Sequence, residues 1–388
     1  MKIKNCPICE SKQLKVFLER KNVPVHQNLV VDHQESARLI KKGELKFVTC
    51  ERCSFVFNQN FDFSLLNYGE NYDNTQSFSG HFESYLDDLV KKLVEEKGIK
   101  NCNIVEIGCG KGHFLRKLVS YPEAKNQGYG FDPSYVGPLI DLDGKLQFQK
   151  TYYDDTCHKI KADVIICRHV IEHIQEPLII LEIIRKNIEI GSNTRVFFET
   201  PCVEWILKNR VIWDFFYEHC SLFTAQSLSL AFQLKGFTVD SVEHIFGDQY
   251  LWLEAHLEQP NHIRFENSIL DLCLAYAHDE YELINHWLFH LNKEVKNSKV
   301  ALWGAGAKGA TFANLCDPDG MLFDCIIDVN PNKQNCYIPG TGHPIVAPQD
   351  LTLRNVKKAI LMNPNYLEEN LKLLSDLKIE LNFIDWSK

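Results

Sequence analysis

A short stretch around residue 110 combines residue types that are typical of a ligand-binding turn. It runs Val105-Glu106-Ile107-Gly108-Cys109-Gly110-Lys111-Gly112, so an apolar run is followed by three closely spaced glycines. Because glycine has no β-carbon, such a turn bends tightly and its backbone approaches a ligand closely. A further acidic residue, Asp132, lies 22 positions after Gly110 at the end of the next apolar run. These residues predict a strand, a ligand-binding turn and the start of a helix.

The position of Glu106 separates two classes of ligand. A carboxylate beside the turn attracts a cationic group and repels a pyrophosphate, so a dinucleotide is disfavoured. Its charge suits the amino group and the sulfonium of S-adenosylmethionine, while Asp132 is placed to accept both ribose hydroxyls. We therefore predict that this methyl donor binds here. A nucleotide-binding α/β domain of another kind is the alternative.

Four cysteines form a second group with a defined spacing. Cys6-Pro7-Ile8-Cys9 and Cys50-Glu51-Arg52-Cys53 are two CxxC pairs separated by 40 residues. Each pair can direct two thiolates at one metal ion, and together they complete a tetrahedral sulfur site of the kind that holds structural zinc. Such a site would supply much of the folding free energy of this polar segment. A redox dithiol or unrelated cysteines are the alternatives.

The donor-binding turn requires a sheet behind it, and the surrounding sequence has the corresponding alternation. Apolar strand-like runs alternate with helical patterns, which predicts an α/β fold with a parallel sheet and helices on both faces. The helical patterns lie at residues 113–119 and 176–187. The predicted strands are residues 103–107, 128–131, 162–166 and 195–199.

The chain divides into three predicted domains: a zinc-binding domain (1–75), a methyltransferase domain (76–258) and a smaller Rossmann-like domain (259–388). The last one opens with a long helical pattern and then repeats the strand–glycine–helix theme at Val300 to Gly309. Its GxGxxG spacing and the later Asp328 raise the alternative of a bound NAD. Nothing else in the sequence indicates hydride chemistry, and the loop and Lys308 are also suited to contacts with phosphates.

Composition excludes several classes of protein. The net charge of −9 and the pI of about 5.9 argue against nucleic-acid binding. No apolar run approaches the length of a membrane span, and the first residues do not form a signal peptide. Ten of the 14 cysteines lie outside the two pairs, which is typical of reduced thiols in a cytoplasmic protein. We expect no membrane partner, and a monomer or a weak homo-oligomer.

The donor-site residues resemble the first two motifs of class I methyltransferases. Nearly the full chain is also similar to the sugar C-methyltransferases that act on nucleotide-linked deoxy-4-ketosugars. Those enzymes have an N-terminal zinc-binding segment, a central class I methyltransferase domain and a C-terminal Rossmann-like domain. In the C-terminal part, the resemblance rests on residues 304–309, 327–334 and 337–345. It implies transfer of a methyl group to the carbon beside a ketone, in a sugar nucleotide bound between the last two domains.

The resemblance also implies which residues perform the reaction. The family motif Tyr-x-Glu-His matches Glu218 and His219, and the histidine is the expected base because imidazole titrates near neutral pH. This chain departs from the motif, because Phe216 occupies the tyrosine position and Tyr217 follows one place later. The aromatic pair after the histidine is replaced by Leu222-Phe223.

Further residues follow from the same resemblance. His173 matches a second family histidine near the donor methyl group, and Tyr72 corresponds to an N-terminal active-site tyrosine. Asp154 or Asp155 is the expected partner of the adenine. Arg168 lies at the end of the fourth strand, which faces the reacting methyl group. His169 and His113 are expected to be structural or to line the pocket.

Two other functions fit the sequence. The altered residues around Glu218 favour an O- or N-methyltransferase of another small metabolite on the same scaffold. A zinc-bearing adaptor that binds the donor without chemistry is also compatible, because Glu106, the glycines and Asp132 only bind the cofactor. The sequence leaves open the acceptor, its nucleotide and the atom that is methylated.

Overall fold

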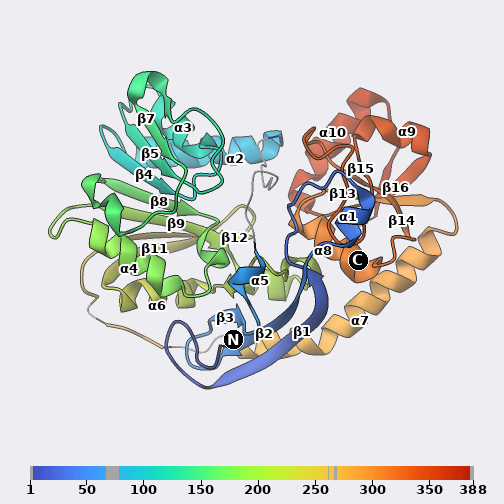
Figure 1. Ribbon diagram of the computed structural model, residues 1–388, viewed down its shortest axis with the longest axis horizontal. Helices are drawn as coiled ribbons and strands as arrows, with labels where there is room; N and C mark the ends of the chain where they lie inside the picture. Colours follow the sequence, from blue (N-terminus) through green and yellow to red (C-terminus); the bar gives the residue numbers. More distant parts are fainter. Residues whose placement is uncertain (1–2, 67–77, 261, 266–268, 385–388) are drawn as a thin grey trace.

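The protein consists of two α/β bodies that are joined by a β-sheet formed mainly from the N-terminal segment (Figure 1). The computed structural model describes residues 3–66, 78–260, 262–265 and 269–384. In Figure 1 the N-terminal segment (blue) lies below and between the central body (cyan to yellow) and the C-terminal body (orange to red). Every helix in these described ranges is too short or too polar to cross a lipid bilayer.

The central body contains an eight-stranded sheet in the order β11-β12-β9-β8-β4-β5-β7-β6. Its five inner strands, from β9 to β7, are parallel, which confirms the expected parallel sheet. The edges differ from that expectation, because β11, β12 and β6 pair in antiparallel fashion. A short turn joins β11 to β12, and such a connection permits only antiparallel pairing. The strands are β4 (Asn103–Ile107), β5 (Gln127–Phe131), β6 (Ile140–Asp141), β7 (Leu146–Gln149), β8 (Val164–Arg168), β9 (Arg195–Pro201), β11 (Phe237–Ile245) and β12 (Tyr250–Leu257).

Local sequence signals explain where the central helices begin. The helix after the glycine turn starts at His113, the next one has Pro177 in its first turn, and Thr224 and Ser227 form a capping box for a third. The helical patterns predicted at 113–119 and 176–187 are thereby confirmed. The helices are α2 (Gly80–Lys91), α3 (His113–Ser120), α4 (Pro177–Asn187), α5 (Val203–Lys208) and α6 (Ala225–Leu234).

The C-terminal body is a smaller α/β unit with a parallel five-stranded sheet in the order β15-β14-β13-β16-β17. The long helix α7 crosses beneath it and packs against α5, α8 and β1 (Figure 1). This body confirms the predicted second Rossmann-like fold. Its elements are α7 (Leu270–Glu294), β13 (Lys299–Trp303), α8 (Ala307–Cys316), β14 (Phe323–Ile327), β15 (Ile345–Val346), α9 (Leu351–Arg354), β16 (Val356–Leu361), α10 (Leu367–Leu377) and β17 (Asn382–Ile384).

The N-terminal sheet includes a strand from the middle of the chain. Its order is β1-β2-β3-β10, and β10 (Ser221–Leu222) pairs with β3 through Ser221–Phe57 and Leu222–Val56. The predicted boundary near residue 75 therefore does not separate two independent units. The short helix α1 instead lies on the C-terminal body, where the backbone N–H of Gly340 donates to the carbonyl of Ala37. The N-terminal elements are β1 (Leu14–Pro24), α1 (Gln34–Arg38), β2 (Lys42–Cys50) and β3 (Val56–Asn58).

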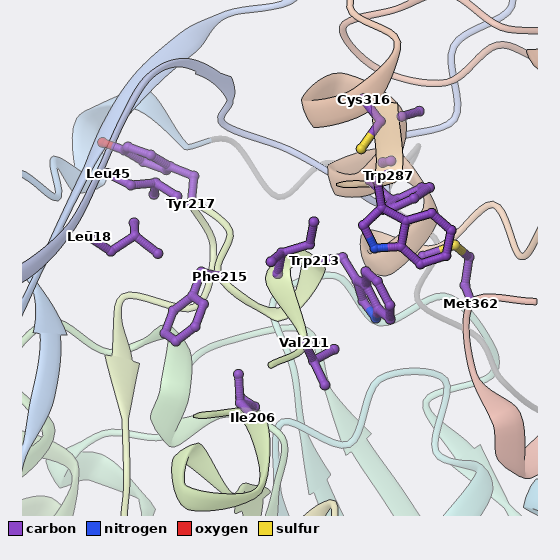
Figure 2. Packing of buried hydrophobic residues seen from close by; sticks show 14 of the residues in the cluster. Leu18, Leu45, Ile206, Val211, Trp213, Phe215, Tyr217, Trp287, Cys316 and Met362 are labelled. Carbon is purple, nitrogen blue, oxygen red and sulfur yellow. The ribbon is translucent and has the colours of Figure 1, made fainter. Parts of the chain in front are cut away.

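One hydrophobic core connects the N-terminal sheet, the segment 203–222 and the C-terminal body. Figure 2 shows side chains of this core pointing toward one another from all three parts. Trp213 lies at the centre, and its ring packs edge-on against the rings of Trp287 and Phe312. Because these side chains are buried by all three parts, the segment 203–222 is held in one place.

Arg20 of β1 adds a polar connection inside this core. Its guanidinium donates to the carbonyls of Ile212 and Phe215 and forms an ion pair with Glu280 of α7 at 2.6 Å. The side chains of Arg20 and Glu280 are only 7% and 14% exposed, so solvent screens this pair weakly. Arg20 thus attaches the N-terminal sheet to the segment that leads to His219.

The substitution Arg20→Met is expected to lower the free energy of unfolding by about 3 kcal/mol or more, because it leaves Glu280 and two carbonyls unpaired. Thermal denaturation of the two proteins measures the difference. Lys46→Met is the matched control, since Lys46 pairs with Glu19 at the surface and such pairs contribute about 1 kcal/mol or less. An equal loss in both variants would contradict this account of Arg20.

Candidate active site

The glycine turn after β4 has a backbone that side chains would obstruct. Gly108, Gly110 and Gly112 have φ values of 70°, 53° and 73°, in the left-handed region that favours glycine. A β-carbon on Gly108 would lie 2.1 Å from Val170, and one on Gly112 would lie 2.4 Å from Phe148. The conformation of the turn therefore favours glycine at all three positions, and space also requires it at Gly108 and Gly112.

Two carboxylates border this turn at the carboxyl ends of β4 and β5, the edge at which open α/β sheets bind ligands. Asp132 is half-buried and its Oδ2 accepts the backbone N–H of Gly110 at 2.8 Å. Its Oδ1 accepts the N–H and the hydroxyl of Ser134. The structure thus brings Glu106, the glycine turn and Asp132 together, as the spacing predicted.

Glu106 is fully buried, and this environment determines its charge. Burial raises the pKa of its carboxyl to about 8, and the nearby charge of Arg168 opposes this rise. Its Oε2 has no hydrogen-bond partner among the described residues, and neither does Nη2 of Arg168. These two unsatisfied groups fit the amino group and the carboxylate at the methionine end of the expected donor.

A buried network of charges lies beside Glu106, at the carboxyl ends of β8 and β9. Glu199 accepts from Arg168 at 2.6 Å and pairs with His169 at 2.9 Å, and Glu172 approaches the other ring nitrogen of His169 at 3.3 Å. Burial opposes the charge of His169, but the two carboxylates raise its pKa to about 9. Burial likewise opposes the charge of Glu199, yet Arg168 and His169 lower its pKa to about 2. Arg168, His169 and Glu199 are therefore ionised at neutral pH.

Two members of this network, Glu199 and Glu172, were not among the site residues predicted from the sequence. Glu199 ends a predicted strand, as Asp132 does, and this position was the available signal. His169 also has φ of 54°, an unusual backbone conformation for a residue other than glycine. Such strain persists only where the surroundings enforce it, and it is common at ligand-binding sites.

A cavity of about 250 Å³ lies between the central and C-terminal bodies. One wall belongs to the central body and contains Trp205, Asp214 and Phe216 together with three histidines. The other wall belongs to the C-terminal body and contains the second glycine loop with Lys308, Asp328 and Lys333. The histidines in the lining are His169, His173 and His219.

His173 and His219 are neighbours in this cavity, with ring centroids 4.9 Å apart. Burial lowers the pKa of His219 well below its usual value, and the positive charges of nearby groups add to this effect. His219 is therefore neutral at physiological pH. Nδ1 of His173 lies 2.9 Å from the carbonyl oxygen of Glu218, so this nitrogen carries a hydrogen and donates it to the carbonyl.

The N-terminal segment fixes the residues on either side of His219. The carboxylate of Glu218 is buried and accepts the backbone N–H of Gln27 at 2.8 Å. It therefore positions the loop through the N-terminal segment, whereas its carbonyl orients His173. Phe216 packs on His219 with ring centroids 4.0 Å apart.

The structure corrects the expectation that Tyr217 belongs to the catalytic group. Tyr217 is fully buried, and its hydroxyl accepts the backbone N–H of Asp62 at 2.9 Å. Its ring packs against Phe61, and it is not part of the cavity lining. The physical reason is the turn at residues 217–218, which directs Tyr217 toward the N-terminal sheet while Phe216 faces the cavity. Tyr72, the other expected tyrosine, lies outside the described residues.

Asp154 and Asp155, the expected adenine partners, are exposed at the start of a short 3-10 helix. Asp154 Oδ1 accepts the N–H and the hydroxyl of Thr156, and Asp155 lies 3.7 Å from Lys186 of α4. Both line a shallow hollow beside α4, separate from the cavity between the domains. Their own partners thus occupy them in this structure, and their contact with adenine remains a prediction.

The four paired cysteines converge on one point, as their spacing predicted. Sγ of Cys6 lies 3.5 Å from that of Cys53, and the same distance separates Cys9 and Cys50. All four sulfur atoms lie within 4.8 Å of one another, and none forms a disulfide. Four sulfur ligands around zinc are about 3.8 Å apart at ideal geometry, so the cluster is compatible with this metal.

Two family models match the chain. A model described as a methyltransferase domain matches residues 78–242. A model described as a C-methyltransferase C-terminal domain matches residues 277–379. No curated protein matches the chain.

Several solved structures resemble part of the chain. Magnesium protoporphyrin IX methyltransferase from Synechocystis PCC 6803 with bound SAH has 15% identity and a TM-score of 0.36, covering 47% of this chain and 87% of that chain. N,N-8-amino-8-demethyl-D-riboflavin dimethyltransferase from Streptomyces davawensis has 15% identity and a TM-score of 0.35, and the match covers 45% of this chain and 54% of that chain. The N1-methyltransferase of 1,6-didemethyltoxoflavin from Burkholderia thailandensis has 11% identity and a TM-score of 0.34, and the match covers 46% of this chain and 80% of that chain.

The match to the methyltransferase domain agrees with the geometry of the site. It spans the glycine turn, Glu106, Asp132 and the network around Glu199. The protein is therefore an S-adenosylmethionine-dependent methyltransferase with a class I fold and a C-methyltransferase C-terminal domain.

Donor binding is expected to depend on pH through Glu106. The pKa of its carboxyl is raised to about 8, so at lower pH it must release a proton before it can attract the cationic donor. The affinity for S-adenosylmethionine should thus rise with pH, by up to about tenfold per unit between about pH 6 and pH 8. Isothermal titration calorimetry across this range measures it.

Glu106→Gln should weaken donor binding at pH 8 and abolish this pH dependence, because the amide cannot ionise. Glu96→Gln, at an exposed position on the same body, should bind as the wild type does. Unchanged affinity in Glu106→Gln would show that this carboxylate does not hold the donor.

Proposed function

We propose that the enzyme methylates the carbon atom beside the ketone of a nucleotide-linked deoxysugar. The main support is the cavity between the two bodies, because two adjacent histidines there face a second glycine loop. The match of the C-terminal body to a C-methyltransferase domain favours carbon over oxygen or nitrogen as the methylated atom.

Transfer to carbon requires that a base first remove a proton from the carbon beside the ketone. His219 is our candidate, because its lowered pKa keeps it neutral and able to accept a proton at physiological pH. His173 lies against it and lines the same cavity. We assign His219 the role of base and His173 a supporting role beside it.

We assign the nucleotide part of the acceptor to the second glycine loop. Helix α8 begins at this loop, and its first backbone N–H groups have no side-chain cap. Anions bind favourably at such helix ends. Lys333 is buried behind the loop, where its Nζ donates to the carbonyl of Ala305 and no carboxylate pairs with it among the described residues. A buried cation without a counter-ion favours an anionic ligand such as a diphosphate.

Asp328 is suited to the ribose of that nucleotide. It ends β14, and its Oδ2 accepts the backbone N–H of Ala305 at 2.7 Å. Asp132 has the same relation to Gly110 in the donor site. The two glycine loops would thus hold two nucleosides on opposite sides of the cavity, with the reacting groups between them.

We also propose that the four cysteines of the N-terminal segment bind one structural zinc ion. All four ligand positions are supplied by the protein, so no position is left for substrate, and the metal would contribute to folding rather than to chemistry. Cys50 ends β2, which pairs with β3, and β3 pairs with β10 beside His219. A bound metal would therefore stabilise the sheet that supports the base.

The decisive assay follows hydrogen exchange at the acceptor. In D₂O, the wild type is expected to introduce deuterium at the carbon beside the ketone of a suitable sugar nucleotide, and His219→Asn should lose this exchange by about 10²-fold or more. NMR or mass spectrometry detects the label, and the binding of S-adenosylmethionine should stay intact. His113→Asn is the control, because His113 is exposed and pairs with Glu83.

Failure of the wild type to exchange or methylate any ketosugar nucleotide would overturn the proposed acceptor. If the product contained an O-methyl or N-methyl group, the alternative small-metabolite function would replace it. Full exchange in His219→Asn would transfer the role of base to His173.

Metal analysis of the purified protein is expected to find about one zinc ion per chain. Cys53→Ser should lose the metal and lower the melting temperature, since Cys53 is buried within the cluster. Cys102→Ser is the control, because Cys102 lies outside the cluster. A metal-free wild type of unchanged stability would contradict the zinc proposal.

A further inference from the structure

Proton removal from a carbon beside a ketone creates negative charge on the ketone oxygen, and this charge requires a partner. His219 has a lowered pKa, so it is a weak base and cannot drive the reaction alone. An electrophile positioned at the oxygen would stabilise the enolate in a site with little water. The identity of this electrophile rests on the proposed function.

Three residues that line the cavity are cationic: Lys308, Lys333 and His169, which is protonated because its pKa is raised. Both ring nitrogens of His169 already face carboxylates, Glu199 and Glu172, so it has no N–H to donate. Lys333 is buried behind the glycine loop, where it bonds to Ala305. Among the described lining residues, this leaves Lys308.

Lys308 extends from the first turn of α8 across the cavity toward the wall that contains His219. Its Nζ lies 3.0 Å from Oδ2 of Asp214 and 5.6 Å from the centre of the Trp205 ring. Asp214 precedes Phe216 and His219 in the segment that the shared core fixes. The ammonium group therefore belongs to the wall of the base, although its backbone belongs to the C-terminal body.

The remaining contacts of Lys308 fit a group that meets substrate. Its side chain is 27% exposed, whereas that of Asp214 is 9% exposed, so the carboxylate is enclosed and the ammonium faces the cavity. An ammonium group has three donors, and Asp214 is the one acceptor found for it in the described chain. The positive charge also acts on His219 and helps to keep it neutral.

We propose that Lys308 is a catalytic residue that donates a hydrogen bond to the ketone oxygen and stabilises the enolate. The C–H bond beside the ketone breaks, its proton moves to a ring nitrogen of His219, its electron pair forms the C=C bond of the enolate, and the carbonyl π electrons move to the oxygen. The C=O bond then re-forms while the electron pair of the C=C bond attacks the methyl group of S-adenosylmethionine. A C–C bond forms, the S–CH₃ bond breaks, and the electron pair stays on the sulfur of S-adenosylhomocysteine. Lys308 remains protonated throughout, and Asp214 is a positioning residue that aims it.

The test compares Lys308→Met with the wild type, using a ketosugar nucleotide that the wild type accepts. Deuterium exchange and kcat should both fall by about 10² to 10³-fold, as is typical when one donor to an oxyanion is removed. KM for the acceptor should change little, and calorimetric binding of S-adenosylhomocysteine, which also reports folding, should stay unchanged. Lys308→Arg keeps the charge and should retain more exchange than Lys308→Met. Lys357→Met, at an exposed position of the same body, is the control.

Asp214→Asn separates positioning from other effects. If Asp214 acts by aiming Lys308, the substitution Asp214→Asn should slow exchange little further once Lys308 is absent. The double variant should then exchange about as slowly as Lys308→Met alone. Fully additive losses would contradict the positioning role.

Three results would overturn the proposal. Unchanged exchange in Lys308→Met would exclude a role in enolate formation. A raised KM with unchanged kcat would show that Lys308 binds the acceptor's phosphates, because uniform binding affects only KM. Absence of any exchange in the wild type would refute the proposed C-methylation itself and this inference with it, whereas exchange that is equal in the wild type and Lys308→Met would refute only the role of Lys308.

Discussion

The pairing of β10 with β3 is the constraint on which the acceptor site depends. It makes a short piece of the central body the fourth strand of the N-terminal sheet, two residues after His219. Arg20 and the carboxylate of Glu218 hold the same segment from the N-terminal side. His219, the proposed base, therefore has a fixed position because three parts of the chain meet around it, rather than because of its own local sequence.

Charge divides the molecule into two kinds of site. Around the donor, Glu172 and Glu199 already face the cations Arg168 and His169, so Glu106 is the carboxylate left to attract a sulfonium group once it ionises. In the cavity between the bodies, by contrast, Lys308 and Lys333 of the C-terminal body share the lining with His219, whose lowered pKa leaves it neutral. A cationic methyl donor and an anionic acceptor would thus approach each other from opposite sides. The polarity of each site suits the ligand that we assign to it.

Sequence analysis predicted the features that depend on neighbouring residues. The glycine turn, Asp132 and the cysteine pairs follow local rules of conformation and spacing, and the structure brings each group together. It did not predict the partner of β10, because a two-residue strand has no pattern of its own and forms only where another edge is available. The prediction that Tyr217 belongs to the catalytic group was wrong for a related reason, since the direction of its side chain depends on a turn and on packing against the N-terminal sheet.

The central claim is that the cavity between the two bodies supports transfer of a methyl group to carbon. Incubation with ¹³C-methyl S-adenosylmethionine and a panel of 4-ketosugar nucleotides, followed by NMR of the product, tests it most directly. The account predicts a new methyl group bonded to the carbon beside the ketone. A labelled methyl group on oxygen or nitrogen, or turnover that never involves a ketosugar, would contradict it.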